Sequence, residues 1–161
     1  MKLFLKRDSV GAEDGFSVLT ESAGLKYSVS VFTDKTRQKA LIQDSSGSTV
    51  SEIIHKNLVV QYFAVKCSGR FYVLVPYRKE CFTFMIYGST YRFAGSLGRG
   101  RFSLFDVDKS PVMTQKKCWS RFGDGYQLEI FREDQELFAL SCAVSAAMFL
   151  AAAESSTVLS E

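Results

Sequence analysis

The residues of this 161-residue chain that are best suited to bind a ligand form a basic segment, residues 92–121. The segment holds seven Lys and Arg side chains against two Asp, a local excess of +5, and aromatic residues are interleaved with them. Guanidinium and ammonium groups suit phosphate oxygens because charge-assisted hydrogen bonds are stronger than neutral ones. We therefore predict a site for an anionic lipid headgroup at Arg92, Arg99, Arg101, Lys116 and Lys117. The plainer interpretation is that these are outward positions of alternating strands, exposed only to water.

Two other stretches resemble ligand-binding loops, but each lacks residues that such a loop requires. Residues 95–100 are glycine-rich, yet no Gly-Lys-Ser/Thr ending follows, so we expect a hairpin turn there instead of a phosphate loop. Residues 106–110 resemble the start of a calcium loop. The sixth position of that loop is Pro111 instead of Gly and the twelfth is Lys117 instead of Glu, so the sharp turn and the bidentate carboxylate are missing. We predict no metal site and no cofactor.

His55 is the only histidine of the chain, and a Cys–His nucleophile would have to pair it with Cys67 or Cys81. Its neighbours read as the end of a strand that enters a turn, which predicts a surface or edge position. We therefore predict no catalytic residue and a protein that is not an enzyme.

The charge balance of the chain argues against some partners. There are 20 Lys and Arg residues against 17 Asp and Glu residues, and the net charge of +3 is too small to indicate a nucleic-acid partner. The charge is unevenly distributed, however. Residues 1–132 carry 20 basic and 12 acidic groups, or +8, whereas the residues from Glu133 onward include five acids and no Lys or Arg. The modest total conceals a basic body.

The four cysteines suggest a reducing environment. None of them forms a CxxC pair, and each lies in an apolar or aromatic stretch, which favours buried free thiols over a disulfide framework. The first residues contain too short an apolar run for a secretory signal. We expect a cytoplasmic location, or a peripheral one at a membrane.

Short strand-like runs recur at even spacing over about residues 3–131, with turn residues between them. Several alternate cleanly between apolar and polar residues, as in residues 27–31, which places one face in a core and the other in water. No helical crossover separates the runs, so the sheet is expected to be antiparallel. The twelve predicted strands are 3–5, 16–19, 27–32, 39–43, 50–55, 58–67, 71–75, 82–87, 91–96, 102–106, 112–116 and 126–131.

The pattern changes after the last strand, where residues 135–154 contain neither Gly nor Pro and residues 137–153 contain no charge. Acids at positions 133, 134 and 136 suit a helix N-terminus. We predict a helix over about residues 135–153 that is apolar all round, and is therefore enclosed by protein or embedded in lipid. Its length is at the lower limit for a span and no Lys or Arg follows it, so enclosure is favoured over a membrane anchor. A barrel of more than eight strands leaves a lumen that a helix can fill.

These features are similar to those of the LURP-one-related family. The resemblance covers essentially the whole chain and is carried by Tyr27–Val31, by residues 41–47, 87–88 and 102–106, and by Gly125–Phe131 leading into the apolar helix. It implies a tubby-like fold: a mainly β, twelve-stranded antiparallel barrel enclosing a hydrophobic C-terminal helix, as a single domain over residues 1–161. Two strands of this pattern end in an Asp followed by a turn, at Asp44 and at Asp106. One departure is that the turn after Asp106, residues 106–111, lacks a Gly such as Gly47 in the turn after Asp44.

The resemblance implies no enzymatic activity. Better-understood relatives of the fold are phosphoinositide-binding tubby domains, although none of their binding residues can be carried over to this chain. We expect a non-enzymatic binding or regulatory module for anionic phospholipid or phosphoinositide headgroups, without a transmembrane span. The alternative is a structural or protein-interaction barrel that has no lipid role and binds an unknown partner.

Overall fold

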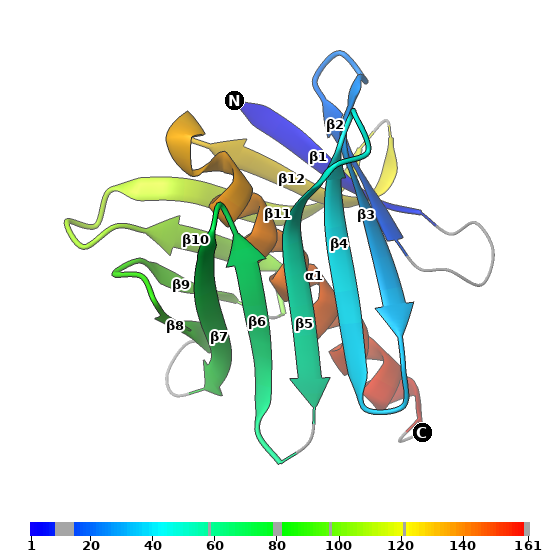
Figure 1. The fold of residues 1–161 in the computed structure, drawn as a ribbon, viewed down its shortest axis with the longest axis vertical. Helices are drawn as coiled ribbons and strands as arrows, with labels where there is room; N and C mark the ends of the chain where they lie inside the picture. Colours follow the sequence, from blue (N-terminus) through cyan, green and yellow to red (C-terminus); the bar gives the residue numbers. More distant parts are fainter. Residues whose placement is uncertain (9–14, 58, 79–81, 97, 121, 160–161) are drawn as a thin grey trace.

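The protein forms a closed barrel of twelve antiparallel strands around one C-terminal helix (Figure 1). The computed structural model describes residues 1–8, 15–57, 59–78, 82–96, 98–120 and 122–159. The elements are β1 (Lys2–Asp8), β2 (Gly15–Thr20), β3 (Leu25–Thr33), β4 (Arg37–Asp44), β5 (Thr49–Asn57), β6 (Gln61–Cys67), β7 (Arg70–Arg78), β8 (Phe82–Tyr87), β9 (Arg92–Ser96), β10 (Arg101–Phe105), β11 (Pro111–Ser120), β12 (Gly123–Ile130), η1 (Glu133–Gln135) and α1 (Glu136–Leu159).

Each strand pairs with its neighbours in sequence, and β1 closes the barrel by pairing with β12. Every one of the twelve predicted strands overlaps an observed strand in the same order, so the predicted fold class is confirmed. The first residue of the predicted strand 58–67 lies outside the described residues. The pairing is antiparallel throughout because short turns join consecutive strands.

Because consecutive strands run in opposite directions, successive turns lie at opposite ends of the barrel, which we call its two mouths. The helix-start mouth, where β12 leads into α1, carries the turns that follow even-numbered strands. The helix-end mouth carries the turns that follow odd-numbered strands, and Ala152 of α1 lies there beside residues 33–38 and His55.

The helix fills the lumen, as predicted. Residues 138–148 of α1 are buried without interruption, and they pack against the inward side chains of the strands. The helix extends beyond the predicted end at residue 153, to Leu159. By length and composition alone it is apolar enough to cross a membrane, but most of that stretch is buried inside the barrel.

The two serines of the helix make hydrogen bonds inside the apolar lumen. The Ser141 hydroxyl donates to the Leu137 carbonyl and lies 2.7 Å from the Ser51 hydroxyl of β5. The Ser145 hydroxyl donates to the Ser141 carbonyl at 2.8 Å. Because a buried hydroxyl without a partner is costly, these bonds allow serine at fully buried positions.

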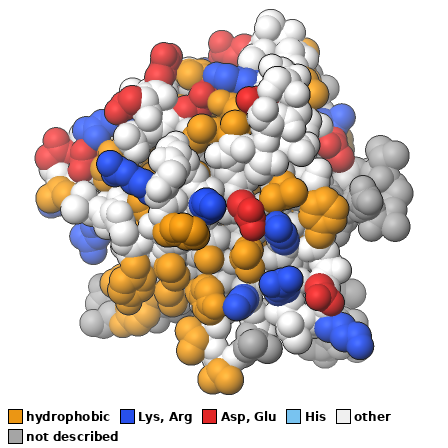
Figure 2. All heavy atoms as spheres, in the orientation of Figure 1, with side chains coloured by type: hydrophobic (Ala, Val, Ile, Leu, Met, Phe, Trp, Pro, Cys, Tyr) orange, Lys and Arg blue, Asp and Glu red, His pale blue; other side chains and the backbone are white. Residues whose placement is uncertain are grey.

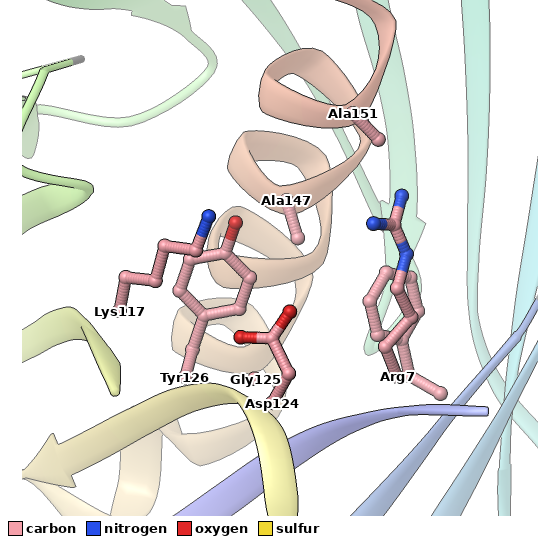
Figure 3. A pocket seen from close by; sticks show the side chains of 8 residues that line it. Arg7, Lys117, Asp124, Gly125, Tyr126, Ala147 and Ala151 are labelled. Carbon is pink, nitrogen blue, oxygen red and sulfur yellow. The ribbon is translucent and has the colours of Figure 1, made fainter. Parts of the chain in front are cut away.

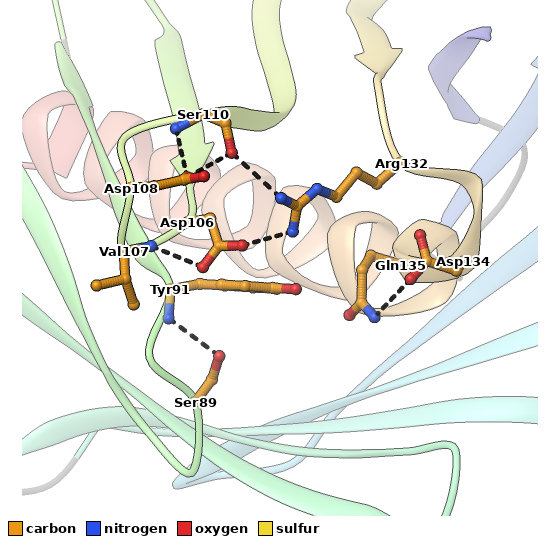
Figure 4. A network of polar contacts seen from close by, with 9 residues as sticks. All are labelled: Ser89, Tyr91, Asp106, Val107, Asp108, Ser110, Arg132, Asp134 and Gln135. Atoms are coloured by element: carbon orange, nitrogen blue, oxygen red, sulfur yellow. Dashed lines mark hydrogen bonds and ion pairs between the residues drawn. The ribbon is translucent and has the colours of Figure 1, made fainter.

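Two ion pairs fix the start of the helix to the barrel. Glu136 lies 2.5 Å from the Lys26 ammonium and accepts a hydrogen bond from the Tyr27 hydroxyl, which ties α1 to β3. Burial and this bond to Glu136 raise the pKa of Tyr27, so the phenol stays protonated. Just before the helix, the Arg132 guanidinium contacts Asp106 at 2.5 Å and the Ser110 hydroxyl at 3.2 Å (Figure 4).

The turns at residues 44–48 and 106–110 share one backbone geometry, although the second lacks a glycine. In each, the first residue donates its N–H to the carbonyl of the fifth, and the N–H of the fourth donates to the carbonyl of the first, at 2.9–3.0 Å. The fourth residue has positive φ in both turns, +85° for Gly47 and +68° for Lys109. Hydrogen bonds from the Val107 and Ser110 N–H groups to Asp side chains support the less favourable Lys109 conformation.

Candidate functional site

Arg101 and Lys116 face each other across β10 and β11 on the outside of the barrel. They are directly opposed in the register of the two strands. Both are exposed, because the adjacent Phe102 and Gln115 turn inward and are buried. Directly opposed like charges repel, and neither side chain forms an ion pair with another residue that the structure describes. An anion between them would relieve this repulsion.

A hollow of about 280 Å³ lies over this pair and contains additional polar groups. Its lining includes the hydroxyl-bearing residues Ser103 and Thr114, which oppose each other in the same register, and Gln127 of β12, which opposes Lys116. Hydroxyl and amide groups donate hydrogen bonds to phosphate oxygens. The hollow can therefore hold a phosphate-sized anion through two cations and several neutral donors.

Glu129 also lines this hollow and weakens its positive charge. It opposes Thr114 on one side and Lys2 of β1 on the other. Neither the neutral donors nor Glu129 was predicted as a site residue from the sequence. Strand alternation marked them as outward positions, but only the strand register places them beside Arg101 and Lys116.

The structure groups some of the predicted site residues and separates others. Arg99 lies exposed in the turn just before Arg101, at the helix-end mouth. Arg92 lies at the other end of β9, where it opposes Phe105, whereas Arg101 opposes Ser96. Four residues of extended chain separate these positions, roughly 13 Å. Arg92 therefore does not belong to the Arg101–Lys116 hollow.

Lys117 points to the other side of β11 and does not join the outer hollow either. It lies at the helix-end mouth with Arg7, Asp124 and Tyr126, beside two alanines of α1 (Figure 3). Gly100 passes directly over it with φ +60°, and a Cβ at Gly100 would approach the Lys117 Cβ to 2.8 Å. The predicted set thus reduces to Arg101 and Lys116, with Arg99 adjacent. Arg121, which was counted in the basic segment, lies outside the described residues.

The prediction that His55 is a surface or edge histidine was wrong. Its side chain is only 3% exposed and stacks on Phe63, with ring centroids 4.1 Å apart and planes within 9°. Its ring nitrogens contact the Gln38 Oε1 at 3.3 Å and the Gln61 Nε2 at 2.8 Å. Alternate residues of β5 point into the barrel, and His55 is one of them, after Ser51 and Ile53.

The structure does not bring His55 and Cys67 together. His55 opposes Phe63 in the β5–β6 register, whereas Cys67 opposes Ser51 at the other end of the strand pair. Cys81 lies outside the described residues. The described thiols, Cys67, Cys118 and Cys142, are all free, and burial raises the pKa of each. Within the described ranges, no group of three or more His, Cys, Asp and Glu side chains is arranged to hold a metal ion.

Burial of His55 predicts a pH dependence of stability. Burial lowers the pKa of the folded-state imidazole below its ordinary value of 6.5, because the interior disfavours the charged ring. The unfolded chain then binds the proton more readily, so the free energy of unfolding falls as pH drops below about 6.5. The fall ends once the folded-state pKa is passed, and its slope for one proton is at most about 1.4 kcal/mol per pH unit.

Urea unfolding of the wild type and of a His55→Gln variant between neutral and mildly acidic pH measures this effect. The variant should lose the part of the slope that begins near the ordinary histidine pKa. Equal slopes for the two proteins would show that another group controls the acid sensitivity.

Comparisons with known proteins add similarity at the level of sequence. The chain is 25% identical over 154 residues to "Uncharacterized protein YxjI" of Bacillus subtilis (strain 168), a match that covers 93% of this chain and 94% of that protein. No family model matches the chain. No solved structure matches it.

Proposed function

We propose that the protein is a non-enzymatic module that binds anionic phospholipid headgroups, phosphoinositides among them, on the outer face of β10 and β11. The observation that carries this proposal is the directly opposed, exposed pair Arg101 and Lys116, set in a hollow with neutral donors. Two directly opposed cations destabilise a strand pair, and an anion bound between them would remove that cost. The protein would act in the cytoplasm, peripherally at the membrane surface.

The charge distribution of the barrel supports the same surface. Arg99, Arg101, Lys116 and Lys117 all lie toward the helix-end mouth, whereas the acids Glu133, Asp134 and Glu136 lie at the helix-start mouth. A surface with one dominant sign of charge attracts a membrane of the opposite sign. The resemblance to a fold with phosphoinositide-binding members agrees with this proposal without contributing residues to it.

The test is co-sedimentation of the wild type and Arg101→Ala/Lys116→Ala with vesicles. Vesicles of equimolar phosphatidylcholine and phosphatidylserine should bind the wild type, and vesicles of phosphatidylcholine alone should bind it less. Each membrane-facing cation contributes about 1 kcal/mol, so the double variant should bind about 30-fold more weakly. Binding of the wild type should weaken as ionic strength rises, because salt screens exposed charges.

A matched control removes the same charge from the helix-end mouth but away from the hollow, which separates the hollow from the general charge of that mouth. Lys35 and Arg37 are exposed residues at the β3–β4 connection, and Lys35→Ala/Arg37→Ala should bind more tightly than the Arg101→Ala/Lys116→Ala variant. Glu129→Gln should strengthen binding, because it removes the negative charge from the hollow. If both double variants lost binding equally, only total charge would matter. If the wild type did not prefer anionic vesicles, the proposal would fall and the protein-interaction alternative would take its place.

A further inference from the structure

The outer face of β6, β7 and β8 is apolar where strand alternation normally places polar residues. On β7 the inward residues Tyr72 and Leu74 are buried, yet the outward positions 71, 73, 75 and 77 are all apolar or aromatic. Phe71 is 69% exposed and Tyr87 of β8 is 60% exposed. The β7 strand therefore presents apolar side chains on both faces. We call the outward apolar and aromatic residues of these strands the apolar face: Tyr62, Ala64, Phe71, Val73, Val75, Tyr77, Met85 and Tyr87.

The register makes this face one continuous patch. Val73 opposes Ala64 on one side and Tyr87 on the other, and Val75 opposes Met85. Figure 2 shows hydrophobic side chains gathered in the lower left of the view, where β6, β7 and β8 lie in Figure 1. A contiguous exposed patch of large apolar side chains marks an interaction surface, whereas isolated exposed hydrophobic residues need no explanation.

The rim of the apolar face is basic. The Lys66 ammonium lies 5.5 Å from the centre of the Phe71 ring, and the Lys56 ammonium lies 6.0 Å from the centre of the Tyr62 ring. Arg92 is exposed on β9, next to Phe93, which opposes Phe84 of β8. Arg92, which does not line the hollow at Arg101 and Lys116, thus lies beside the apolar face instead.

Acidic side chains are almost absent from the strands that carry and flank the apolar face, and the acids Glu133, Asp134 and Glu136 lie on the inner side of β7, in a pocket with Arg70 and Tyr72. Among the described residues of β5–β9, Glu52 is the only acid, and its carboxylate lies 3.3 Å from the Lys39 ammonium. The apolar face therefore carries a net positive rim. A partner that covers it must combine an apolar interior with a negative surface.

We propose that the apolar face docks on an anionic phospholipid bilayer, with Phe71, Met85 and Tyr87 at the level of the headgroup–acyl boundary and the rim cations among the headgroups. Exposed Phe and Tyr rings edged by Lys and Arg suit that boundary, because it offers apolar chains beside negative charge. A second copy of the chain fits less well, since its apolar face would bring an identical positive rim against this one. The inference rests on the proposed lipid function and adds the surface that meets the membrane.

Tryptophan reporters test which face meets the bilayer. Trp119 is the only tryptophan and is 83% exposed, so Trp119→Phe gives a background without tryptophan. Phe71→Trp in that background reports on the apolar face. Phe32→Trp, at a comparably exposed aromatic position on β3, is the matched control. Both are mixed with equimolar phosphatidylcholine–phosphatidylserine vesicles whose acyl chains carry bromine, which quenches tryptophan only on close approach.

The expected result is strong quenching at position 71 and little at position 32, with both proteins bound. In parallel, Phe71→Ser/Tyr87→Ser should bind these vesicles at least about tenfold more weakly, because two side chains no longer transfer from water. Circular dichroism and the urea midpoint confirm that this exposed double variant is folded.

Each other outcome overturns a defined part of the proposal. If the proteins bind but position 71 is not quenched more than position 32, the apolar face does not meet the membrane, while headgroup binding at Arg101 and Lys116 stands. If the wild type does not bind the anionic vesicles, the proposed function fails as well. If light scattering shows a dimer that Phe71→Ser/Tyr87→Ser dissolves, a second copy covers the face and the membrane inference is wrong.

Discussion

Phe84→Ala is expected to lower the free energy of unfolding by about 3–5 kcal/mol, the range for truncating a well-packed aromatic residue. Phe84 is 1% exposed and lies at the centre of a group of aromatic rings. Its ring centre is 5.3 Å from Phe93, 5.9 Å from Phe102, 6.1 Å from Phe63 and 5.8 Å from Phe149. The first three belong to the barrel wall and Phe149 belongs to α1, so the substitution opens a cavity between the wall and the helix.

Chemical unfolding of purified wild type and variant measures this loss. Phe32→Ala is the matched control, because Phe32 is the same residue type at a position that is 47% exposed. We expect it to change the free energy of unfolding by less than about 0.5 kcal/mol. A loss at Phe84 no larger than that at Phe32 would contradict the packing described for the lumen.

Gly95→Ala is expected to be similarly damaging, by about 3 kcal/mol, for a different reason. A Cβ at Gly95 would lie 1.8 Å from the Arg101 carbonyl oxygen and 2.7 Å from the Phe102 Cα, both backbone atoms of β10. Backbone cannot move away as a flexible side chain can, so β9 and β10 would have to separate. That separation would also displace Arg101 from Lys116.

Gly98→Ala is the control for this prediction. Gly98 has no atom within 4 Å of the added Cβ and lies in the connection between the same two strands. Gly98→Ala should leave the urea midpoint and vesicle binding unchanged, whereas Gly95→Ala should lower both. An unchanged midpoint for Gly95→Ala would show that the two strands can separate without cost.

The charge asymmetry found along the sequence acquires a spatial meaning in the barrel. The acids that follow residue 132 include Glu136, which pairs with Lys26 at the helix-start mouth, and the preceding Arg132 pairs with Asp106 there. These charges hold the helix in place. Arg101 and Lys116, on the outside of β10 and β11, form no ion pair with another residue that the structure describes. Arg101 and Lys116 are therefore available to bind an anion.

Sequence alone was sufficient for the architecture because its signals are local. Alternation in residues 27–31 and 126–130 defines strands within a few residues, and the uncharged stretch at 137–153 defines a helix that is apolar all round. The number of strands then favours enclosure of that helix in the barrel. The sequence-based prediction was wrong where the residues next to a position did not reveal which way its side chain points. His55 was assigned to the surface from its neighbours, although the phase of β5 carries it inward.

The composition of the candidate surfaces was decided only by the tertiary structure. Arg92, Arg101 and Lys117 belong to one basic segment in the sequence, but strand register and phase place them on the edge of the apolar face, in the outer hollow and at the helix-end mouth, respectively. Likewise, the apolar face joins outward residues of three strands whose individual runs look ordinary. Burial preference is a property of each residue and its near neighbours, whereas register and barrel closure depend on pairing between distant segments. The sequence by itself therefore identified the basic side chains that could bind an anion, and the closed barrel decided which of them lie together and which neutral groups lie beside them.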